Sequence, residues 1–125
     1  MTVSINTVHP KDFIKTTVTG VLNFAVGKQA LLAIASQVDQ PGEYQILIDT
    51  RGADSVLSLV GIFELDKAMD SFSSFERCKI ALLTSIRDSK DAKFLQTTSA
   101  NRGIRIRAFT NFEKAITWLV MKDVV

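Results

Sequence analysis

The stretch "YQILIDTRGADSVLS", residues 44–58, decides the fold class of this 125-residue chain. It opens with an apolar run that is typical of a central, buried strand, and Asp49 closes that run. A polar loop with one glycine follows, and Ser58 stands directly before a segment with helical periodicity. A buried strand that leads through a polar loop into a helix is the repeating unit of α/β proteins with parallel sheets.

Further strands are predicted on both sides of this stretch. Residues 3–8 alternate apolar and polar side chains, and the segment 13–20 follows after a turn at "HPK". So short a connection predicts an antiparallel hairpin. Two more strands are predicted at residues 78–84 and 104–110, the second with a regular alternation of apolar and polar side chains.

Four helices are predicted from apolar residues at helical spacing. They cover residues 23–39, 58–72, 88–102 and 111–122. A polar side chain stands at the start of each, where it can bind a free backbone N–H group. These predicted caps are Asn23, Ser58, Asp88 and Thr110, the last in a capping box with Glu113.

The resulting element order is β-β-α-β-α-β-α-β-α. It predicts an α/β fold with right-handed crossovers and a mixed five-stranded sheet, opened by the N-terminal antiparallel hairpin. No repeat, low-complexity tract or linker interrupts the pattern, so residues 1–125 are predicted to form a single domain. A chain of this length can bury a core without disulfides or metals.

The composition argues against several classes of protein. A net charge of +2 is too small to predict nucleic-acid binding. The sequence shows no secretory signal and no apolar run long enough for a membrane span, and its one cysteine excludes an internal disulfide. We therefore expect a cytoplasmic protein.

Candidate site residues gather at the carboxyl edge of the predicted sheet, where open α/β sheets meet their ligands and partners. They lie in the loop after the central strand and in the loop "TSIRDS" after the next strand. The set comprises Asp49, Arg51, Asp54, Ser55, Ser58, Thr84, Ser85 and Arg87. Two interpretations of Asp49 stay open: an anchor for a partner, or an acceptor for loop amides around Gly52.

The element order and three segments carry a family resemblance. The segments are "VTGVL", "YQILIDTRG" and "NRGIRIRAFTNFEKAITWL". With them the chain resembles the STAS family, the domain of bacterial anti-sigma-factor antagonists and sulfate-transporter tails, in a branch of small SpoIIAA-like proteins. At the level of the fold it also resembles the lipid-binding CRAL-TRIO domains.

The resemblance implies a phosphorylation site. In antagonist STAS domains a partner kinase, which doubles as the anti-sigma factor, phosphorylates a serine at the start of the second helix. Counting from Asp49, that serine is Ser58, and Ser55 is the second choice. The chain departs from the family pattern of aspartate, two hydroxyl residues and glycine, because it reads "VLSLVG" here. The other interpretation of Ser58 is an ordinary helix cap.

Other residues are weaker candidates for a functional site. His9 lies in a turn without further metal ligands at a suitable spacing, and Cys78 begins a strand, where burial is expected. Arg51 is a candidate anion contact, and Arg102, Arg105 and Arg107 could extend that surface or simply be solvated. No catalytic motif is present, so we predict no enzyme, cofactor or metal.

Two functions follow as hypotheses. The first is a non-enzymatic protein-interaction domain, regulatory and phospho-switched in the manner of an antagonist, with a protein partner such as a kinase or anti-sigma factor. The alternative is a carrier or sensor for a small apolar or lipid-like ligand, suggested by eight phenylalanines and the CRAL-TRIO resemblance. Phe72 and Phe75 are the phenylalanines expected near a pocket mouth or a homodimer surface.

Overall fold

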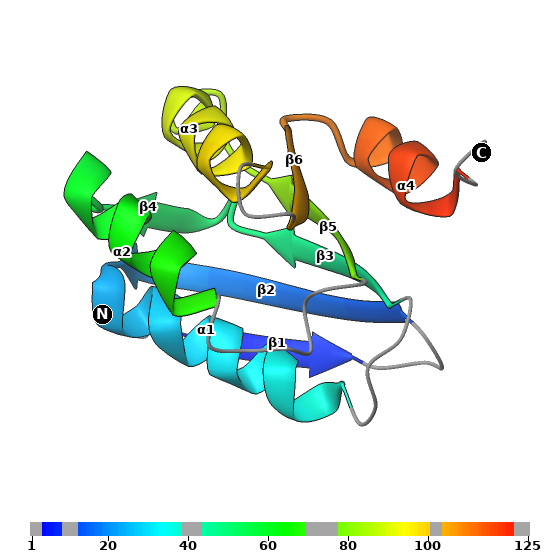
Figure 1. Ribbon diagram of the computed structural model, residues 1–125, viewed down its shortest axis with the longest axis horizontal. Coiled ribbons are helices and arrows are strands. Elements are labelled where there is room, and N and C mark those ends of the chain that lie inside the picture. Colours follow the sequence, from blue (N-terminus) through cyan, green and yellow to red (C-terminus); the bar gives the residue numbers. More distant parts are fainter. Residues whose placement is uncertain (1–3, 9–12, 39–43, 70–77, 101–103, 122–125) are drawn as a thin grey trace.

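A computed structural model describes residues 4–8, 13–38, 44–69, 78–100 and 104–121 (Figure 1). Within these residues one sheet holds six strands. Five lie side by side in the order β1 (Ser4–Val8), β2 (Phe13–Leu22), β3 (Gln45–Asp49), β5 (Lys79–Leu83) and β6 (Arg105–Phe109). β1 runs antiparallel to β2, and every other pair is parallel.

Four helices cover the two faces of the sheet unequally. α1 (Phe24–Gln37), α2 (Leu59–Met69) and α3 (Ser89–Ala100) stand together in Figure 1, and α4 (Phe112–Val120) lies apart from them. Leu31, Ile34 and Leu65 pack with Ile46 and Ile80 in the larger core. On the other face, the α4 residues Ala115 and Leu119 pack on Leu47, Ala81 and Leu83. The alternation of side chains along β3 and β5 supplies both cores.

The predicted five-stranded sheet is wrong. A sixth strand, β4 (Ala53–Ser55), lies within the stretch that was predicted as loop and pairs with β2. The element order is therefore β-β-α-β-β-α-β-α-β-α. Three residues are too few for a period of two to be recognised in the sequence, and this strand is stabilised by its pairing with the long β2.

β3 and β4 continue along the same partner strand with one extra residue between them. Asp49 is paired with Thr17 and Ala53 with Gly20, so residues 50–52 lie opposite only two residues of β2. The extra residue is held in a turn, in which the Ala53 amide donates to the Thr50 carbonyl at 3.0 Å. Gly20 has φ 81°, a backbone conformation that glycine adopts without strain. This interruption, residues 50–52, is a β-bulge.

Helix caps agree with the sequence at α1 and α2 and differ at the other two helices. The Asn23 side chain accepts from the Val26 amide as predicted. At α4 the predicted capping box at Thr110 is wrong, because the side chain of Asn111 accepts from the Lys114 amide instead. The predicted side-chain cap at Asp88 is also corrected: its carboxylate binds Ser85 and Arg87, and it is the Asp88 backbone carbonyl that accepts from α3, from the Ala92 amide at 3.1 Å.

Lys79 connects the sheet to the end of α4. Its side chain is buried, and Nζ donates to the carbonyls of Trp118 at 2.6 Å and Met121 at 2.8 Å. The ammonium also lies 4.8 Å from the centre of the Trp118 ring. A cation at this point binds carbonyls at the end of the helix and interacts favourably with the helix dipole. The Trp118 carbonyl also accepts from the Met121 amide at 3.3 Å.

β6 forms one edge of the sheet. Arg105 and Arg107 are exposed there while Ile104 and Ile106 are buried, as their alternation predicted. The Ala108 amide donates to the Gln96 side chain from α3 at 2.9 Å. Charged side chains and a covered backbone amide both oppose the pairing of this edge with another chain.

Candidate functional site

Asp49 closes β3 and binds the arginine two residues later. Its carboxylate accepts from the Arg51 amide at 3.0 Å, from Nε at 3.1 Å and from Nη2 at 2.9 Å. Burial acts to raise the pKa of Asp49, but the hydrogen bonds and charge of Arg51, with the charge of Lys15, outweigh it and lower the pKa. Asp49 is therefore an ionised group that is already bound within its own loop.

The Asp49–Arg51 pair lies beside α4. The Arg51 guanidinium is 6.0 Å from the ring centre of Phe112, the first residue of α4, and the Lys15 ammonium is 5.8 Å from the same ring. Cation–π contacts at such exposed positions are weak. They nevertheless place this pair on the side of the sheet that α4 covers.

A second polar group joins β4 to the loop after β5. Arg87 Nη2 binds Asp54 at 2.8 Å, and Nε lies 3.3 Å from Asp88. The Ser85 hydroxyl donates to Asp88 at 3.2 Å. Both Asp54 and Arg87 are exposed, so solvent screens their ion pair and its contribution to stability is small.

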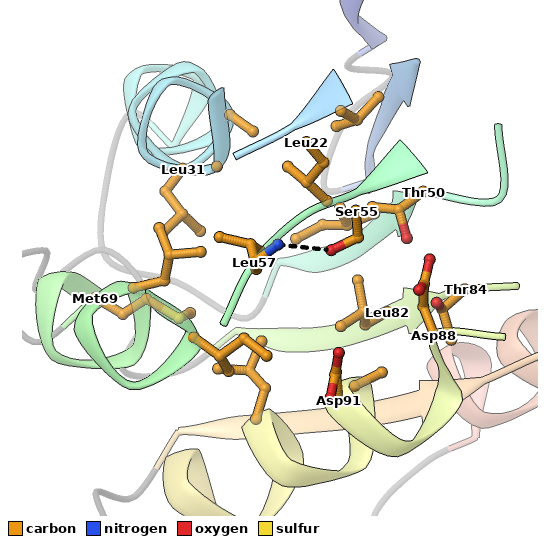
Figure 2. A pocket seen from close by; sticks show the side chains of 18 residues that line it. Leu22, Leu31, Thr50, Ser55, Leu57, Met69, Leu82, Thr84, Asp88 and Asp91 are labelled. Carbon is orange, nitrogen blue, oxygen red and sulfur yellow. Dashed lines mark hydrogen bonds between the residues drawn. The ribbon is translucent and has the colours of Figure 1, made fainter. Parts of the chain in front are cut away.

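An apolar cavity of about 110 Å³ lies between the sheet and the helices α1, α2 and α3 (Figure 2). Its walls are aliphatic and include Leu31, Leu57, Leu65, Met69 and Leu82. Hydroxyl and carboxylate groups stand on one side of it. They are Thr50, Ser55, Thr84, Asp88 and Asp91.

The bulge decides which β4 side chain reaches this cavity. Ser55 is paired with Leu22, and both residues line the cavity. If the register of β3 continued unbroken through the same residues, Asp54 would be paired with Leu22 and a carboxylate would stand at this position. Instead Asp54 is exposed and binds Arg87.

A polar depression of about 360 Å³ lies between the starts of α3 and α4. Its lining includes Thr84, Ser89 and Asn111 together with the lysines Lys93 and Lys114. Thr84 also lines the apolar cavity, so it stands between the two hollows.

Ser58 caps α2. Its hydroxyl accepts from the Gly61 amide at 3.0 Å, and its carbonyl accepts from Ile62 at 3.0 Å. This geometry confirms the cap interpretation. Ser58 is exposed, and no described residue is seen to bind its hydroxyl apart from Gly61.

Large apolar side chains close to Ser58 in sequence are exposed to solvent. Val56 is 60% exposed, Leu59 56%, Val60 71% and Phe63 40%. Leu59, Val60 and Phe63 stand at positions i, i+1 and i+4 of α2. They therefore share one side of the first turns of this helix. We call these four residues the α2 apolar surface.

The predicted site residues therefore lie in four places rather than one. Asp49 and Arg51 lie beside α4, and Ser58 stands at α2. Asp54 of β4 forms an ion pair with Arg87 in the loop after β5, where Ser85 also lies. Ser55 and Thr84 face the apolar cavity. The sequence suggested an apolar ligand as an alternative but did not identify the residues that line this cavity, because they come from separate strands and helices and read individually as core.

Other sequence candidates are placed as follows. Cys78 is fully buried, as expected, and burial raises the pKa of its thiol despite the opposing effects of the Tyr44 backbone and the Arg105 charge. His9, Phe72, Phe75 and Arg102 lie outside the described residues.

The described residues hold neither a metal-binding cluster nor a helix suited to cross a membrane. No group of three or more His, Cys, Asp or Glu side chains in the described segments is arranged to hold a metal ion. Among the described helices, none combines the length and apolar character that a membrane crossing requires.

Two solved structures are similar to this chain over most of its length. The first is an uncharacterised protein of the DUF3478 family with a SpoIIAA-like fold from Shewanella loihica PV-4. It has a TM-score of 0.61 and 16% sequence identity, over 94% of this chain and 93% of that protein. The chain has a SpoIIAA-like fold.

The second structure is an anti-sigma factor antagonist from Mycobacterium paratuberculosis. Its TM-score is 0.59 with 13% identity, over 94% of both chains. No protein-family model and no curated protein matches the sequence. The predicted STAS resemblance is thus confirmed for the fold, and the CRAL-TRIO resemblance stays a prediction.

Proposed function

We propose that this SpoIIAA-like chain is a cytoplasmic, non-enzymatic and regulatory protein-interaction domain that docks a protein partner at the start of α2. The observation that carries the proposal is the α2 apolar surface, of which Val60 is the most exposed member. Clustered apolar side chains on an otherwise polar surface are typical of protein-interaction sites. The similar structure of an anti-sigma factor antagonist supports this kind of function.

Ser58 gives the proposed surface a switch. Its exposed hydroxyl stands among Val56, Leu59 and Val60 in sequence and at the N-terminus of α2 in space. A phosphate there would carry about −1.5 to −2 charges at pH 7 and would be stabilised by the helix dipole. The same charge would disfavour docking of an apolar partner surface, so phosphorylation by a partner kinase releases the partner.

The test begins with a photo-crosslinking amino acid at position 60, used in the source cells to trap the partner. The purified partner is then titrated by calorimetry against wild type and Val60→Asp. We expect the substitution to weaken binding at least tenfold, because it places a charge in an apolar interface. Ser58→Glu should weaken it likewise, whereas Ser58→Ala should keep the affinity and cost about 1 kcal/mol of stability through the lost cap.

The matched control is Val120→Asp. Val120 is also an exposed helical valine, but it belongs to α4, on the other side of the sheet. Its substitution should leave affinity within twofold of wild type. Equal binding by wild type and Val60→Asp would refute the docking surface. A crosslink only to a second copy of the chain would assign the surface to a homodimer instead.

A second candidate function is binding of a small apolar ligand, and the cavity between the sheet and α1–α3 favours it. At about 110 Å³ the cavity is smaller than typical drug pockets. It is comparable with an engineered apolar cavity of about 150 Å³ that binds benzene. The observation favours a small ring or branched chain over an extended lipid.

A further inference from the structure

The apolar cavity combines an aliphatic interior with a charged border. Its interior is formed by aliphatic side chains from all three helices of that face, among them Leu31, Leu65 and Leu95. A volume of about 110 Å³ accommodates one small ring. The interior therefore favours an apolar ligand portion through the hydrophobic effect. The polar side chains at the border determine which polar group of the ligand binds there.

The border carries negative charge. Among the described residues that line the cavity, Asp88 and Asp91 are the ionisable ones. Asp88 already accepts hydrogen bonds from Ser85 and Arg87. For Asp91, which is half-buried in the first turn of α3, no hydrogen bond or ion pair to another described residue is seen.

Asp91 brings an acidic side chain from the first turn of α3 to the border of the cavity. An anionic ligand would be repelled there, and a neutral one would gain only a hydrogen bond. A cationic ligand gains a charge-assisted hydrogen bond at a half-buried position, where solvent screens the attraction less than at the surface.

Figure 2 shows hydroxyl-bearing side chains across the border from this carboxylate. Thr50 and Ser55 stand opposite α3, and Thr84 lies beside Asp88. An ammonium group donates three hydrogen bonds, and carboxylate and hydroxyl oxygens are suitable acceptors.

We propose that this cavity binds a small organic amine, with an apolar ring or branched body against Leu31, Leu65 and Leu95 and its ammonium on Asp91. The inference rests on the second candidate function and is independent of docking at α2. It names an amine rather than a fatty acid or phospholipid, because the border would repel their negative head groups.

The test titrates the full chain with three molecules of one shape: benzylamine, benzyl alcohol and benzoate. Binding is measured by NMR at pH 7 from the methyl signals of the leucines in the cavity. We expect benzylamine to bind at least tenfold more tightly than benzyl alcohol, and benzoate more weakly than both. In Asp91→Asn the preference of the amine over the alcohol should fall below threefold.

Glu113→Gln is the matched control, because Glu113 is a carboxylate in the first turn of α4 that does not line this cavity. It should keep the wild-type preference. If benzyl alcohol binds wild type as tightly as benzylamine, the amine inference is wrong while the small-ligand function stands. If none of the three molecules shifts the cavity signals, both are wrong, and the protein-docking proposal is untouched.

Discussion

Asp49 and Arg51 show how a single pair of side chains can resemble a binding site in the sequence and serve the loop in the structure. Three hydrogen bonds join them across one intervening residue. The sequence predicted that Asp49 either anchors a partner or binds loop amides, and the contact with the Arg51 amide favours the second. Arg51 as an anion contact stays a prediction, since an anion would have to compete with Asp49.

The lowered pKa of Asp49 predicts a specific pH dependence of stability. A carboxylate with a lowered pKa in the folded state contributes stability above its ordinary value of 3.8, and this contribution is lost as pH falls through the folded pKa. Asp49→Asn should cost about 1–2 kcal/mol at pH 7, a value reduced by the exposure of Arg51. Urea unfolding from pH 7 to pH 2 should show the two proteins converging in acid. A gap that is constant with pH would contradict this.

The end of α4 is the clearest case at the scale of an element. Lys79 was predicted only as part of a strand, yet its ammonium binds two carbonyls about forty residues further along the chain, at Trp118 and Met121. Sequence patterns report residues on one element and its neighbours, whereas this contact depends on α4 packing over β5.

We predict that Lys79→Met destabilises the chain by about 1.5–3 kcal/mol, because two buried hydrogen bonds to a charged group are lost while the apolar stem is kept. Hydrogen exchange should accelerate in the last turn of α4 more than in its first. Lys114→Met, at an exposed position of the same helix, should change stability by less than about 0.5 kcal/mol. Equal effects of the two substitutions would refute the role of Lys79.

Element boundaries show where the sequence was sufficient. Periodicity found the four helices and the five longer strands of the described residues, since apolar residues recur at helical or strand spacing in them. It missed β4, whose pairing is set by the length of β2, and it placed the α4 cap one residue early, because Thr110 and Asn111 both have suitable side chains. The edge location of the site residues was predictable from parallel topology; their separation into four places was not.

At the scale of the whole molecule, the contact between α1 and α2 links the stability of the fold to the free volume of the cavity. A Cβ atom at Gly27 would lie 2.8 Å from Cδ1 of Leu65, a flexible side chain that lines the cavity. We expect Gly27→Ala to turn Leu65 into the cavity. The gain in helix propensity, about 1 kcal/mol, and the filled space should together keep or raise the melting temperature.

The measurement pairs thermal unfolding with the benzylamine titration. Gly27→Ala should keep its stability and lose binding, whereas Gly61→Ala, whose Cβ would make only ordinary contacts, should keep the binding. A loss of more than about 1 kcal/mol in Gly27→Ala would show that Leu65 cannot move.

The bulge at residues 50–52 has a consequence for how this chain can vary in length. Removal of one codon there would leave two residues opposite Val18 and Thr19, so that β3 and β4 would join into one regular strand without changing the partner of Ala53. The core would keep its pairing, while the loop that holds Asp49 against Arg51 would disappear. The sheet itself therefore does not require the extra residue. Whether orthologous genes keep or lose its codon would report selection on the carboxyl edge alone.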